Sequence, residues 1–552
     1  MTTEPGHSPK NVPHILALGG GYATVFLYKK LAPLIRQKKV QMTVVDKNNY
    51  HCFHGLVPEM LVGKIQPSTP LSPMRTLFRG AQFRNGDIEA IDLPNKEVLF
   101  SRGLDGKQFR INYDHLVLDL GSVENLNLYP GMAAHTLRLK AFPDILRARH
   151  HLITMLELAD IERDPVEVTR LLNFVVAGGN YAGVEVAGEL ADFLPRISRQ
   201  RFPNIPVEQI KVTLVHSGAK ILPELGVQFP ELQKYAQEAL AASPYVRLAL
   251  NVRLASATTE EAILNSGERI STRTIINCTG ASSSPLLDTL PFERVGGRVL
   301  TDEFCRVKGS ESVWAGGDCS AIPRQDGTYC PPLAVWAMNA GRQIAINIEA
   351  IYAGRPLEPY RFAGLGDACT IGGWRAAAHL HGVPVRGLIA YLAWRVFMLL
   401  YLPAPEKKVR LFFDWLTASI FGWDVINMNL SRPVSVASVM YEPGQEIVRE
   451  GEVGRSMFVI RTGEVEVLKT PPGGGPAEPK ARLGPGDQFG EIAVFQRIRR
   501  TATVRAVTRV ELLHVGRDAA VALSESNVEI GEALNPASAD GAPGVSDIKE
   551  LK

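Results

Sequence analysis

The sequence has few of the features that mark secreted, metal-dependent or dithiol proteins. It contains 6 cysteines among 552 residues, and no two of them form a C-x-x-C pair. A secreted disulfide framework, a zinc ribbon and a dithiol reductase are therefore not expected, and we predict no metal site. Sixty basic residues against 57 acidic ones leave a net charge of only +3. Because a general nucleic-acid binder carries a large positive excess, we predict no nucleic-acid partner.

Targeting and membrane-spanning patterns are also missing. The N-terminal stretch lacks a charged start followed by an apolar core and a small-residue cleavage site, so we expect no secretion signal and a cytoplasmic location. The longest apolar run, residues 387–405, carries Arg395 in its middle and falls short of the roughly 20 residues that span a bilayer. Spanning is not expected, whereas lying on a membrane surface stays open.

A strand, a glycine turn and a helix are predicted near the start of the chain. Residues 14–18 form the strand and residues 23–36 the helix, with Gly19 and Gly21 between them. Glycine lets backbone N–H groups and the helix N-terminus approach a pyrophosphate closely. Asp46 ends the next predicted strand, where a carboxylate accepts hydrogen bonds from ribose hydroxyls. The pattern predicts a dinucleotide site.

A second unit of the same kind begins with a predicted strand at residues 172–176. Its turn holds Gly178 and Gly183, but Asn180 replaces the middle glycine and brings a side chain toward the pyrophosphate. The following strand ends in His216 rather than in the carboxylate that would accept ribose hydroxyls. A charged imidazole would suit a 2′-phosphate, so the choice between NADH and NADPH stays open.

The rest of the chain divides into a meander, an acidic turn and a β-rich region. Residues 83–117 alternate short strands with turns, as a return β-meander does. Asp318 follows a short apolar strand and can accept hydrogen bonds from the ribityl chain of a flavin, or close a tight turn through an Asx hydrogen bond. Beyond Pro433, glycines punctuate Val/Ile/Phe strands at 8–12 residue spacing, which predicts a small all-β barrel or jelly roll.

Several motifs carry a family resemblance over about residues 12–425. They are G-x-G at 19–21, N-Y-H-x-F at 49–53, the strand 113–118 followed by Gly121, G-V-E-V-A-G-E-L at 183–190 and A-G-G-D-C at 315–319. In this order they resemble the type II NADH dehydrogenases. Those flavoproteins with two dinucleotide folds pass a hydride from NADH to FAD and two electrons to a membrane quinone, without pumping protons.

The resemblance implies roles for individual residues. It implies that Glu185 lies near the flavin and quinone as a proton relay; the alternative is an acid in the first helical turn, stabilised by the helix dipole. FAD would be held by Gly19, Gly21, Asp46 and Asp318, with Gly121 near it, and the pyridine nucleotide by Gly178 and Gly183.

A quinone-lining segment is also implied at residues 334–339. The family pattern resembles A-Q-x-A-x-Q, whereas here Ala334 is followed by Val335, and Asn339 replaces the second Gln. One hydrogen-bonding group is therefore lost. Cys330 is close in sequence and would face the flavin if the protein were a sulfide:quinone oxidoreductase.

Residues 387–421 are predicted as helices that lie on a membrane surface. The first is apolar nearly all round, and the second places Lys407, Lys408 and Arg410 beside several aromatic side chains. Basic residues next to an aromatic-rich face suit an anionic membrane. The predicted location is the cytoplasmic face of the membrane, peripheral. A buried homodimer or domain interface is the alternative use of the same face.

Residues 435–525 resemble a cyclic nucleotide-binding domain. In its phosphate-binding cassette Gly490 opens a short helix, Glu491 accepts from the ribose 2′-hydroxyl and Arg500 pairs with the exocyclic phosphate. Thr501 can help a guanine, so cyclic AMP is preferred and cyclic GMP stays open. A barrel retained without ligand, for dimerisation or docking, is the alternative.

The combined expectation is an α/β protein with two Rossmann-like dinucleotide-binding domains, amphipathic helices and a jelly roll. It predicts an FAD-dependent NAD(P)H:quinone oxidoreductase regulated by a cyclic nucleotide. A sulfide:quinone or other flavin reductase and a catalytically quiet cyclic-nucleotide sensor are the alternatives. The expected parts are a flexible N-terminus at 1–11, a discontinuous FAD-binding domain at 12–165 and 280–380, an NAD(P)-binding domain at 166–279, a membrane-associating segment at 381–430, a cyclic nucleotide-binding domain at 433–530 and a disordered tail at 535–552.

Overall fold

The computed structural model describes most of the chain. The predicted flexible N-terminus and disordered tail lie outside the described residues and stay predictions. The described residues are 12–103, 106–427, 436–452, 454, 456–471, 473, 475–495, 499–516 and 520.

The first dinucleotide unit is built on a five-stranded sheet with the order β22-β9-β1-β2-β5, in which every pair is parallel. Its central strand is fully buried from Ile15 to Leu18, because helices and loops cover both faces of such a sheet. The strand bounds are β1 (His14–Leu18), β2 (Gln41–Asp46), β5 (Gln82–Asn85), β9 (His115–Leu118) and β22 (Val313–Ala315).

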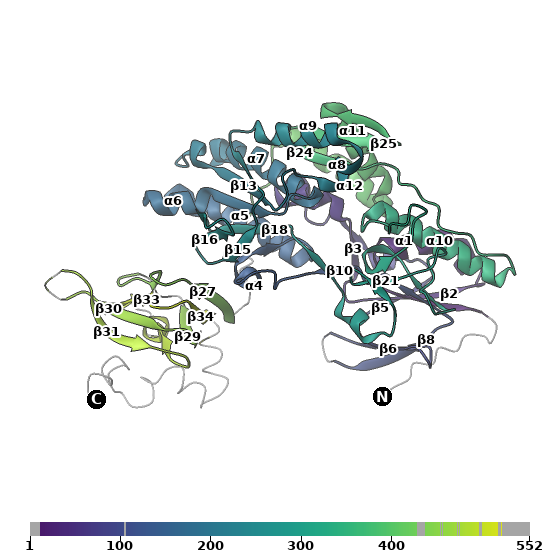
Figure 1. Ribbon diagram of the computed structural model, residues 1–552, viewed down its shortest axis with the longest axis horizontal. Helices are drawn as coiled ribbons and strands as arrows, with labels where there is room; N and C mark the ends of the chain where they lie inside the picture. Colours follow the sequence, from purple (N-terminus) through teal and green to yellow (C-terminus); the bar gives the residue numbers. More distant parts are fainter. Residues whose placement is uncertain are drawn as a thin grey trace.

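Helices α1 (Tyr22–Arg36) and α10 (Ala334–Tyr352) pack against each other beside this sheet (Figure 1). Their backbones meet at Gly341, where a Cβ would overlap the carbonyl of Ala23. The predicted meander is present as β6 (Asp87–Asp92), β7 (Glu97–Ser101) and β8 (Gln108–Asn112), which form an antiparallel sheet.

The second dinucleotide unit has a five-stranded parallel sheet of order β11-β18-β12-β13-β14. Helix α7 (Tyr181–Arg201) follows β12. Pro195 lies inside this helix, and Phe193 and Ile197 on either side of it are buried in the core. The strands are β11 (Leu137–Arg138), β12 (Asn173–Ala177), β13 (Lys211–His216), β14 (Val246–Leu250) and β18 (Thr274–Asn277).

Short elements join and flank the two units. Strand β10 (Ser122–Glu124) pairs with β19 (Ala281–Ser283) where the chain passes between the two parallel sheets. A small antiparallel sheet of order β15-β16-β17 adjoins helix α4. The bounds are α4 (Met132–His135), α5 (Phe142–Ile161), α6 (Pro165–Leu172), α8 (Pro223–Gln228), α9 (Pro230–Ala241), β15 (Leu254–Ala257), β16 (Glu261–Leu264) and β17 (Arg269–Ser271).

The remaining short elements belong to the first unit or its edges. They are β3 (Tyr50–Cys52), α2 (Val57–Leu61), β4 (Leu71–Pro73), α3 (Met74–Leu77), β20 (Arg294–Val295), β21 (Arg298–Leu300) and β23 (Ser320–Ala321).

An antiparallel sheet and two helices follow α10. The sheet contains β24 (Ala368–Gly372), β25 (Arg375–Leu380) and β26 (Val383–Arg386), and the helices are α11 (Gly387–Tyr401) and α12 (Pro405–Phe421). Among the described helices, none is both long enough and apolar enough to cross a bilayer. Large apolar side chains are nevertheless exposed on both helices, namely Leu388, Ile389, Leu392, Val396, Leu400, Val409, Phe412, Phe413, Leu416, Ile420 and Phe421.

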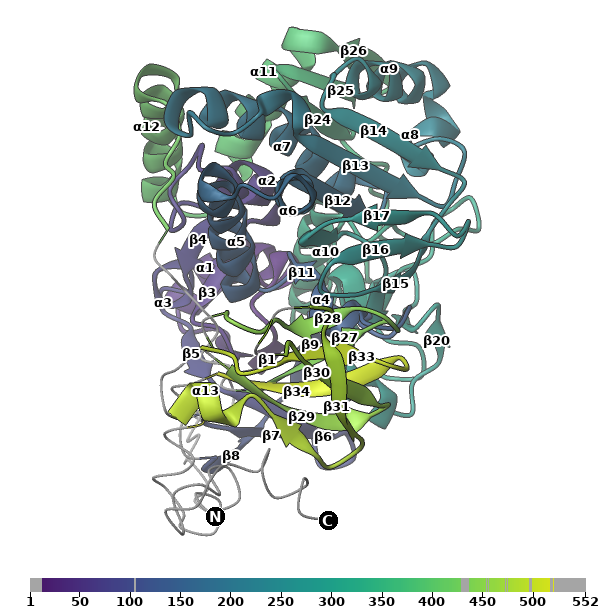
Figure 2. The same ribbon diagram turned by 90° about the vertical axis from the view of Figure 1, so that its left-hand side faces the viewer.

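The C-terminal region is a barrel of two four-stranded antiparallel sheets, with the orders β27-β34-β29-β32 and β28-β33-β30-β31. In Figures 1 and 2 it lies beside α4 and β15, and α11 lies at the opposite end of the molecule. This confirms the predicted jelly roll. The bounds are β27 (Val436–Tyr441), β28 (Glu446–Val448), β29 (Ser456–Thr462), β30 (Val465–Lys469), β31 (Glu478–Leu483), β32 (Gln488–Phe489), α13 (Glu491–Phe495), β33 (Thr503–Ala506) and β34 (Val510–Gly516).

Candidate functional site

The first glycine turn connects β1 to α1 and is closed by Asp46. The N–H of Gly20 donates to Oδ2 of Asp46 at 2.7 Å, and the N–H of Asn48 donates to Oδ1 at 2.7 Å. Gly19 has a φ of +94°, and a Cβ there would overlap the carbonyl oxygen of Asp119. Burial raises the pKa of Asp46. The glycines and the acid thus lie together at one sheet edge.

Asp119 is a second acid at this turn, and it is not among the residues predicted from the sequence. The N–H of Thr24 donates to Oδ2 of Asp119 at 2.8 Å, and a Cβ on Gly21 would lie 2.7 Å from the same carboxyl group. Burial raises its pKa to about 8, and the charges of Asp318 and Asp46 contribute further. Asp119 is therefore largely protonated at neutral pH. Its position directly after a predicted buried strand was the available signal.

Asp318 is bonded to groups from another segment. The hydroxyl of Ser122 donates to Oδ2 of Asp318 at 2.8 Å, and Nζ of Lys140 lies 3.6 Å from the same oxygen and contacts the Ser122 hydroxyl. These partners link it to β10 and the segment before α5. Gly121 precedes Ser122 with a φ of +62°, and a Cβ there would meet nothing within 4 Å. Gly121 therefore lies close to Asp318, because it is adjacent to Ser122, which donates to that carboxylate.

These residues fit a flavin dinucleotide. The glycine turn opens a helix whose N-terminus favours an anion, and Asp46 and Asp318 offer acceptors for ribose and ribityl hydroxyls. An ionised Asp119 would repel a pyrophosphate, whereas its protonated form would be able to donate a hydrogen bond to a phosphate oxygen. The fit therefore depends on the protonation of Asp119.

The second glycine turn is closed by Asn180, which is the N-cap of α7. Its Oδ1 accepts from the N–H of Gly183 at 3.1 Å, and its Nδ2 donates to the carbonyl of Cys278 at 2.8 Å. A Cβ on Gly183 would overlap the carbonyl of Gly178, which has a φ of +113°. The side chain of Asn180 therefore caps its own helix. The expectation that it projects toward the pyrophosphate is wrong.

His216 contacts the same turn as an acceptor. Its Nδ1 accepts from the N–H of Gly179 at 3.2 Å, so this nitrogen is unprotonated. Partial burial lowers the pKa of His216 as well. The imidazole is therefore neutral near pH 7 and lacks the charge on which the 2′-phosphate alternative was based.

Glu185 lies in the second turn of α7 and is 8% exposed. Its Oε1 accepts from the N–H of Thr370 in β24 at 3.2 Å. Burial raises its pKa to about 8, with the charges of Glu189 and Glu59 adding to the shift. The first turn of α7 holds no acidic residue, so the helix-dipole explanation of Glu185 is wrong.

Glycine at position 188 brings β24 to Glu185. A Cβ there would lie within 2.5 Å of the carbonyl oxygen of Ile371, so only glycine allows the helix and the strand to touch. The strand backbone then reaches Glu185 one turn earlier. This explains the spacing in the G-V-E-V-A-G motif.

A buried charge cluster extends from Glu185 toward α11 and α12, and the sequence did not reveal it. Nζ of Lys64 lies 2.6 Å from Oε2 of Glu189. The indole N–H of Trp415 donates to Oε2 of Glu59 at 2.6 Å, and Arg395 lies 3.5 Å from Oε1 of Glu59. Arg395 thus points into the protein, which leaves the other face of α11 apolar.

The expected quinone segment starts helix α10 at Ala334. Val335 is buried, and Nδ2 of Asn339 donates to its carbonyl at 2.9 Å, while Oδ1 of Asn339 accepts from Arg342 at 3.0 Å. Cys330 is buried, and burial raises the pKa of its thiol to about 11. A thiol that stays protonated at neutral pH is a poor redox nucleophile, which weakens the sulfide reductase alternative.

The barrel brings its predicted binding residues to one place. The guanidinium of Arg500 donates to the carbonyls of Gly490 at 2.9 Å and Ser456 at 2.7 Å and is 7% exposed. Glu491 begins α13 and is also buried; burial raises its pKa, and the Arg500 charge opposes that rise. Thr501 is adjacent and exposed. The arrangement leaves a buried cation where a phosphate-binding cassette needs one.

The barrel also contacts the segment between the two parallel sheets. The N–H of Met440 in β27 donates to Nε2 of His135 in α4 at 2.9 Å. Tyr441 is buried beside Thr259, and Glu260 and Arg273 are close enough to influence its pKa, which burial raises. No pattern in the sequence indicates this contact.

The comparisons with known proteins agree with this geometry. The pyridine nucleotide-disulphide oxidoreductase family matches residues 13–341, and the cyclic nucleotide-binding domain family matches residues 438–527. A probable NADH dehydrogenase of Dictyostelium discoideum is 27% identical over 423 residues, covering 74% of this chain and 90% of that protein. A type II NADH:quinone oxidoreductase of Staphylococcus aureus is 26% identical over 384 residues, covering 68% and 91%.

Solved structures share the fold. The NDH2 of Plasmodium falciparum, solved in complex with NADH, has a TM-score of 0.69 at 17% identity and covers 75% of this chain and 99% of its own. A sulfide:quinone oxidoreductase of Aquifex aeolicus has a TM-score of 0.56 at 15% identity, covering 75% of this chain and 96% of its own. The predicted resemblance is confirmed: the chain belongs to the pyridine nucleotide-disulphide oxidoreductase family, is related there to the type II NADH dehydrogenases, and carries a cyclic nucleotide-binding domain.

Proposed function

We infer that the protein is an FAD-dependent NADH:quinone oxidoreductase, peripheral on a membrane and regulated by a cyclic nucleotide. The observation that carries this inference is the pair of glycine turns, one opening α1 and one opening α7, on two parallel sheets joined by β10 and β19. The domain boundaries and the site residues that were predicted from the sequence are part of what we propose.

The chain supplies positioning in both halves of the reaction. Bound FAD would accept a hydride and pass electrons on, so few catalytic side chains are required. Gly19, Gly21, Asp46 and Asp318 would hold it. Gly178 and Gly183 would receive the pyridine nucleotide, and Ala334, Val335 and Asn339 would border the quinone.

Glu185 is proposed to hold the proton that a reduced quinone requires. With a pKa of about 8 it is protonated at neutral pH, and the carboxyl is shielded from solvent. A buried acid with a pKa near the working pH is suited to general acid catalysis. The carboxylates of Glu189 and Glu59 keep that pKa high.

NADH is proposed as the reductant in preference to NADPH. The neutral imidazole of His216 offers no charge to a 2′-phosphate. The preference rests on this residue, because the relatives of the chain include enzymes named for NADH and enzymes named for NAD(P)H.

Cyclic AMP is proposed to act through the contact between the barrel and α4. To pair with a phosphate, Arg500 would exchange its carbonyl partners at Gly490 and Ser456. Strand β29, which begins at Ser456, pairs with β34, and β34 pairs with β27, the strand that contacts His135. The regulated step would therefore be on the pyridine-nucleotide side, and the contact at α4 lies at the opposite end of the molecule from α11 (Figure 1).

The cyclic nucleotide role is tested with an Arg500→Ala variant. Calorimetry should show at least a thirtyfold loss of cyclic AMP affinity, because charged hydrogen bonds to a phosphate contribute about 2 kcal/mol or more. FAD content should stay normal. The neighbouring Arg499→Ala variant, which loses only an exposed contact to the Gly451 carbonyl, is the control. Unchanged affinity in Arg500→Ala would remove the phosphate role.

The reductase function is tested anaerobically. The purified protein should be yellow, and NADH should bleach its flavin band faster than NADPH does. A quinone should then restore the colour, and cyclic AMP should change the bleaching rate. A yellow protein that neither nucleotide bleaches would contradict the function.

A second candidate is a cyclic-nucleotide sensor whose flavin unit is catalytically quiet. The observation in its favour is Asp119, whose carboxyl lies at the N-terminus of α1 where a pyrophosphate would bind. A protein that binds cyclic AMP tightly but turns over no reductant would support this candidate.

A further inference from the structure

A groove with a positively charged lining lies where α1 and α10 meet the end of α11. We call it the cationic groove. Its volume is about 510 Å³, which lies within the usual range for small-ligand sites. It is lined by Phe26, Lys29, Lys30, Arg342, Leu400 and Tyr401.

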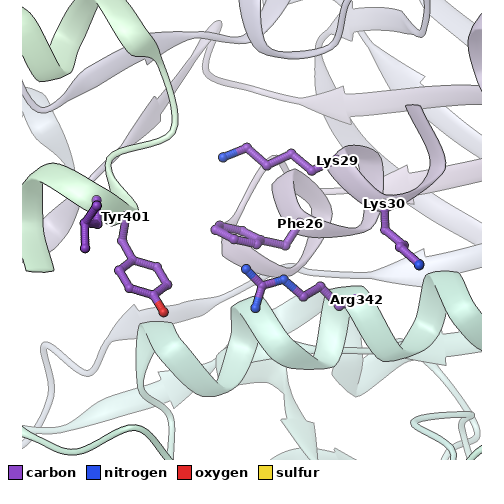
Figure 3. Close-up of a pocket in the computed structure, with 6 residues that line it drawn as sticks. Phe26, Lys29, Lys30, Arg342 and Tyr401 are labelled. Carbon is purple, nitrogen blue, oxygen red and sulfur yellow. The ribbon is translucent and has the colours of Figure 1, made fainter. Parts of the chain in front are cut away.

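The cations of the groove surround an aromatic ring. Nζ of Lys29 and Cζ of Arg342 each lie 4.7 Å from the ring centroid of Phe26. Figure 3 shows the Phe26 ring between these two side chains, with Tyr401 facing them across the groove. The Phe26 ring, at the base of the groove, is buried. The groove therefore combines charge on its walls with an apolar base.

The positive charge here is held by neutral partners. Arg342 donates to the amide oxygen of Asn339, and Nζ of Lys408 in α12 donates to the carbonyl of Leu400 at 2.7 Å. Desolvation lowers the pKa of Lys29, and the nearby charges that add to this shift, Lys408 and Arg342, are both cations. Like charges gathered in this way repel one another, and an anion between them would relieve that repulsion.

The groove is continuous with an exposed apolar surface. Leu400 belongs to the groove and is 65% exposed. One turn earlier on α11, Val396 is 56% exposed, and Leu392 and Ile389 extend the exposed stripe along the helix. An occupant of the groove thus has a charged site at one end and an apolar strip beside it.

We propose that the cationic groove binds the phosphate headgroup of an anionic phospholipid whose acyl chains lie along the exposed stripe of α11. A phosphodiester matches the groove because its oxygens accept from a guanidinium and from ammonium groups at once. The acyl chains match the stripe, which has no polar partner to offer. A free phosphate would use only the charged half.

This proposal rests on the proposed membrane association and makes it specific for lipid charge. The basic residues of α12 already favour anionic lipid, and the groove should add a further, separable part of that preference. The two statements can therefore fail separately.

The test is flotation of the full-length protein with vesicles of pure phosphatidylcholine and of equal parts phosphatidylcholine and phosphatidylglycerol. The groove variant carries both Lys29→Gln and Arg342→Gln. The control is Lys469→Gln with Arg482→Gln, which removes the same charges from exposed positions on barrel strands β30 and β31. Far-ultraviolet circular dichroism and flavin content check the folding of each.

We expect the groove variant to lose roughly tenfold or more of its affinity for the anionic vesicles, while its weaker binding to phosphatidylcholine stays unchanged. The barrel control should bind both vesicles as the parent does. An equal loss in both variants would overturn the groove, because it would reflect net charge alone. Failure to bind either vesicle would overturn the membrane association together with the groove.

Inorganic phosphate separates the lipid from a soluble ligand. Calorimetry with phosphate and no vesicles should show no binding that depends on Lys29 and Arg342. Saturable phosphate binding that disappears in the groove variant would assign the groove to a soluble phosphate and overturn the lipid.

Discussion

The two glycine turns of this protein have the same construction but differ in the charge of the side chains around them. In each, a side chain at the end of the next strand accepts from the turn: Asp46 from Gly20 in the first, His216 from Gly179 in the second. Each helix start is also bonded to a side chain, which is Asp119 in α1 and Asn180 in α7. The first turn is therefore surrounded by acids and the second by neutral groups.

This difference in charge predicts how the affinity of each turn for an anionic ligand depends on pH. Around the second turn no side chain has to change its protonation before a pyrophosphate arrives. Around the first, an acid with a pKa of about 8 must keep its proton. The first site is expected to be pH-dependent, and the second is not.

Among the substitutions that test this comparison, Gly183→Ala should have the largest effect. A methyl group would overlap the carbonyl of Gly178, so the start of α7 must move away from its turn. Flavin reduction by NADH should slow by more than a hundredfold, equivalent to about 3 kcal/mol, while FAD content stays normal because the first turn is untouched. Stopped-flow absorbance measures the rate.

Gly267→Ala is the matched control for this substitution. Gly267 lies in the same unit with a φ of +90°, but a Cβ there meets nothing within 4 Å. It should cost only the strain of a left-handed residue, about 1–2 kcal/mol of stability, and leave reduction unchanged. Equal damage in both variants would mean that the Gly183 contact is not specific.

Glu185→Gln should act on the step after the turns. Helix α7 and its glycine turn stay intact, so reduction by NADH should not change. Quinone reduction should slow by roughly a hundredfold, because the buried proton donor is removed. In the parent, quinone reduction should be high below pH 8 and fall above it, as Glu185 loses its proton; the variant should lack this limb.

The exposed Glu208→Gln variant serves as the control, since Glu208 lies outside the core. Steady-state assays with a soluble quinone across pH measure the profile. A Glu185→Gln variant that keeps the parent profile would remove Glu185 from the proton path.

The local parts of both turns could be predicted from the sequence. Strand β1 matches its predicted bounds, and Asp46 lies at the turn as expected. Glycine requirements and strand ends are set by near neighbours, which a linear pattern records. The same holds for Arg500 and Gly490, whose cassette spans only a few residues.

The pairing of distant side chains could not be predicted. Asp119 meets Thr24 from 95 residues away, and Glu59 meets Trp415 from 356 residues away. Sequence spacing does not state which strand ends become neighbours or which acids share a buried space. The neutral state of His216 likewise depends on its hydrogen bond from the backbone of Gly179, which the spacing along the chain does not state.

Asp119→Asn should sharpen the contrast between the turns. Folding holds the Asp119 proton up to about pH 8, whereas an unfolded Asp releases it near pH 4. This group therefore contributes stability below about pH 4, and the contribution is lost as pH rises toward 8. Above pH 8, FAD affinity should fall by up to tenfold per pH unit, because the ionised carboxylate faces the pyrophosphate.

In Asp119→Asn the FAD affinity should be flat from pH 7 to 9, which flavin fluorescence on release measures. The parent at pH 7 provides the reference. A parent affinity that is also flat over this range would show that Asp119 does not face the bound dinucleotide.

The smallest expected effect is at the second turn, in His216→Lys. The lysine would place a permanent cation where the neutral imidazole now accepts from Gly179. An exposed ion pair with the 2′-phosphate contributes about 1 kcal/mol or less, so the KM for NADPH should fall up to about fivefold, and that for NADH should rise only slightly. His216→Gln, which keeps an acceptor without charge, is the control and should leave the preference unchanged. If His216→Lys leaves the NADPH preference unchanged as well, the end of β13 does not face the adenosine ribose, and the second turn must recognise its nucleotide by some other strand end.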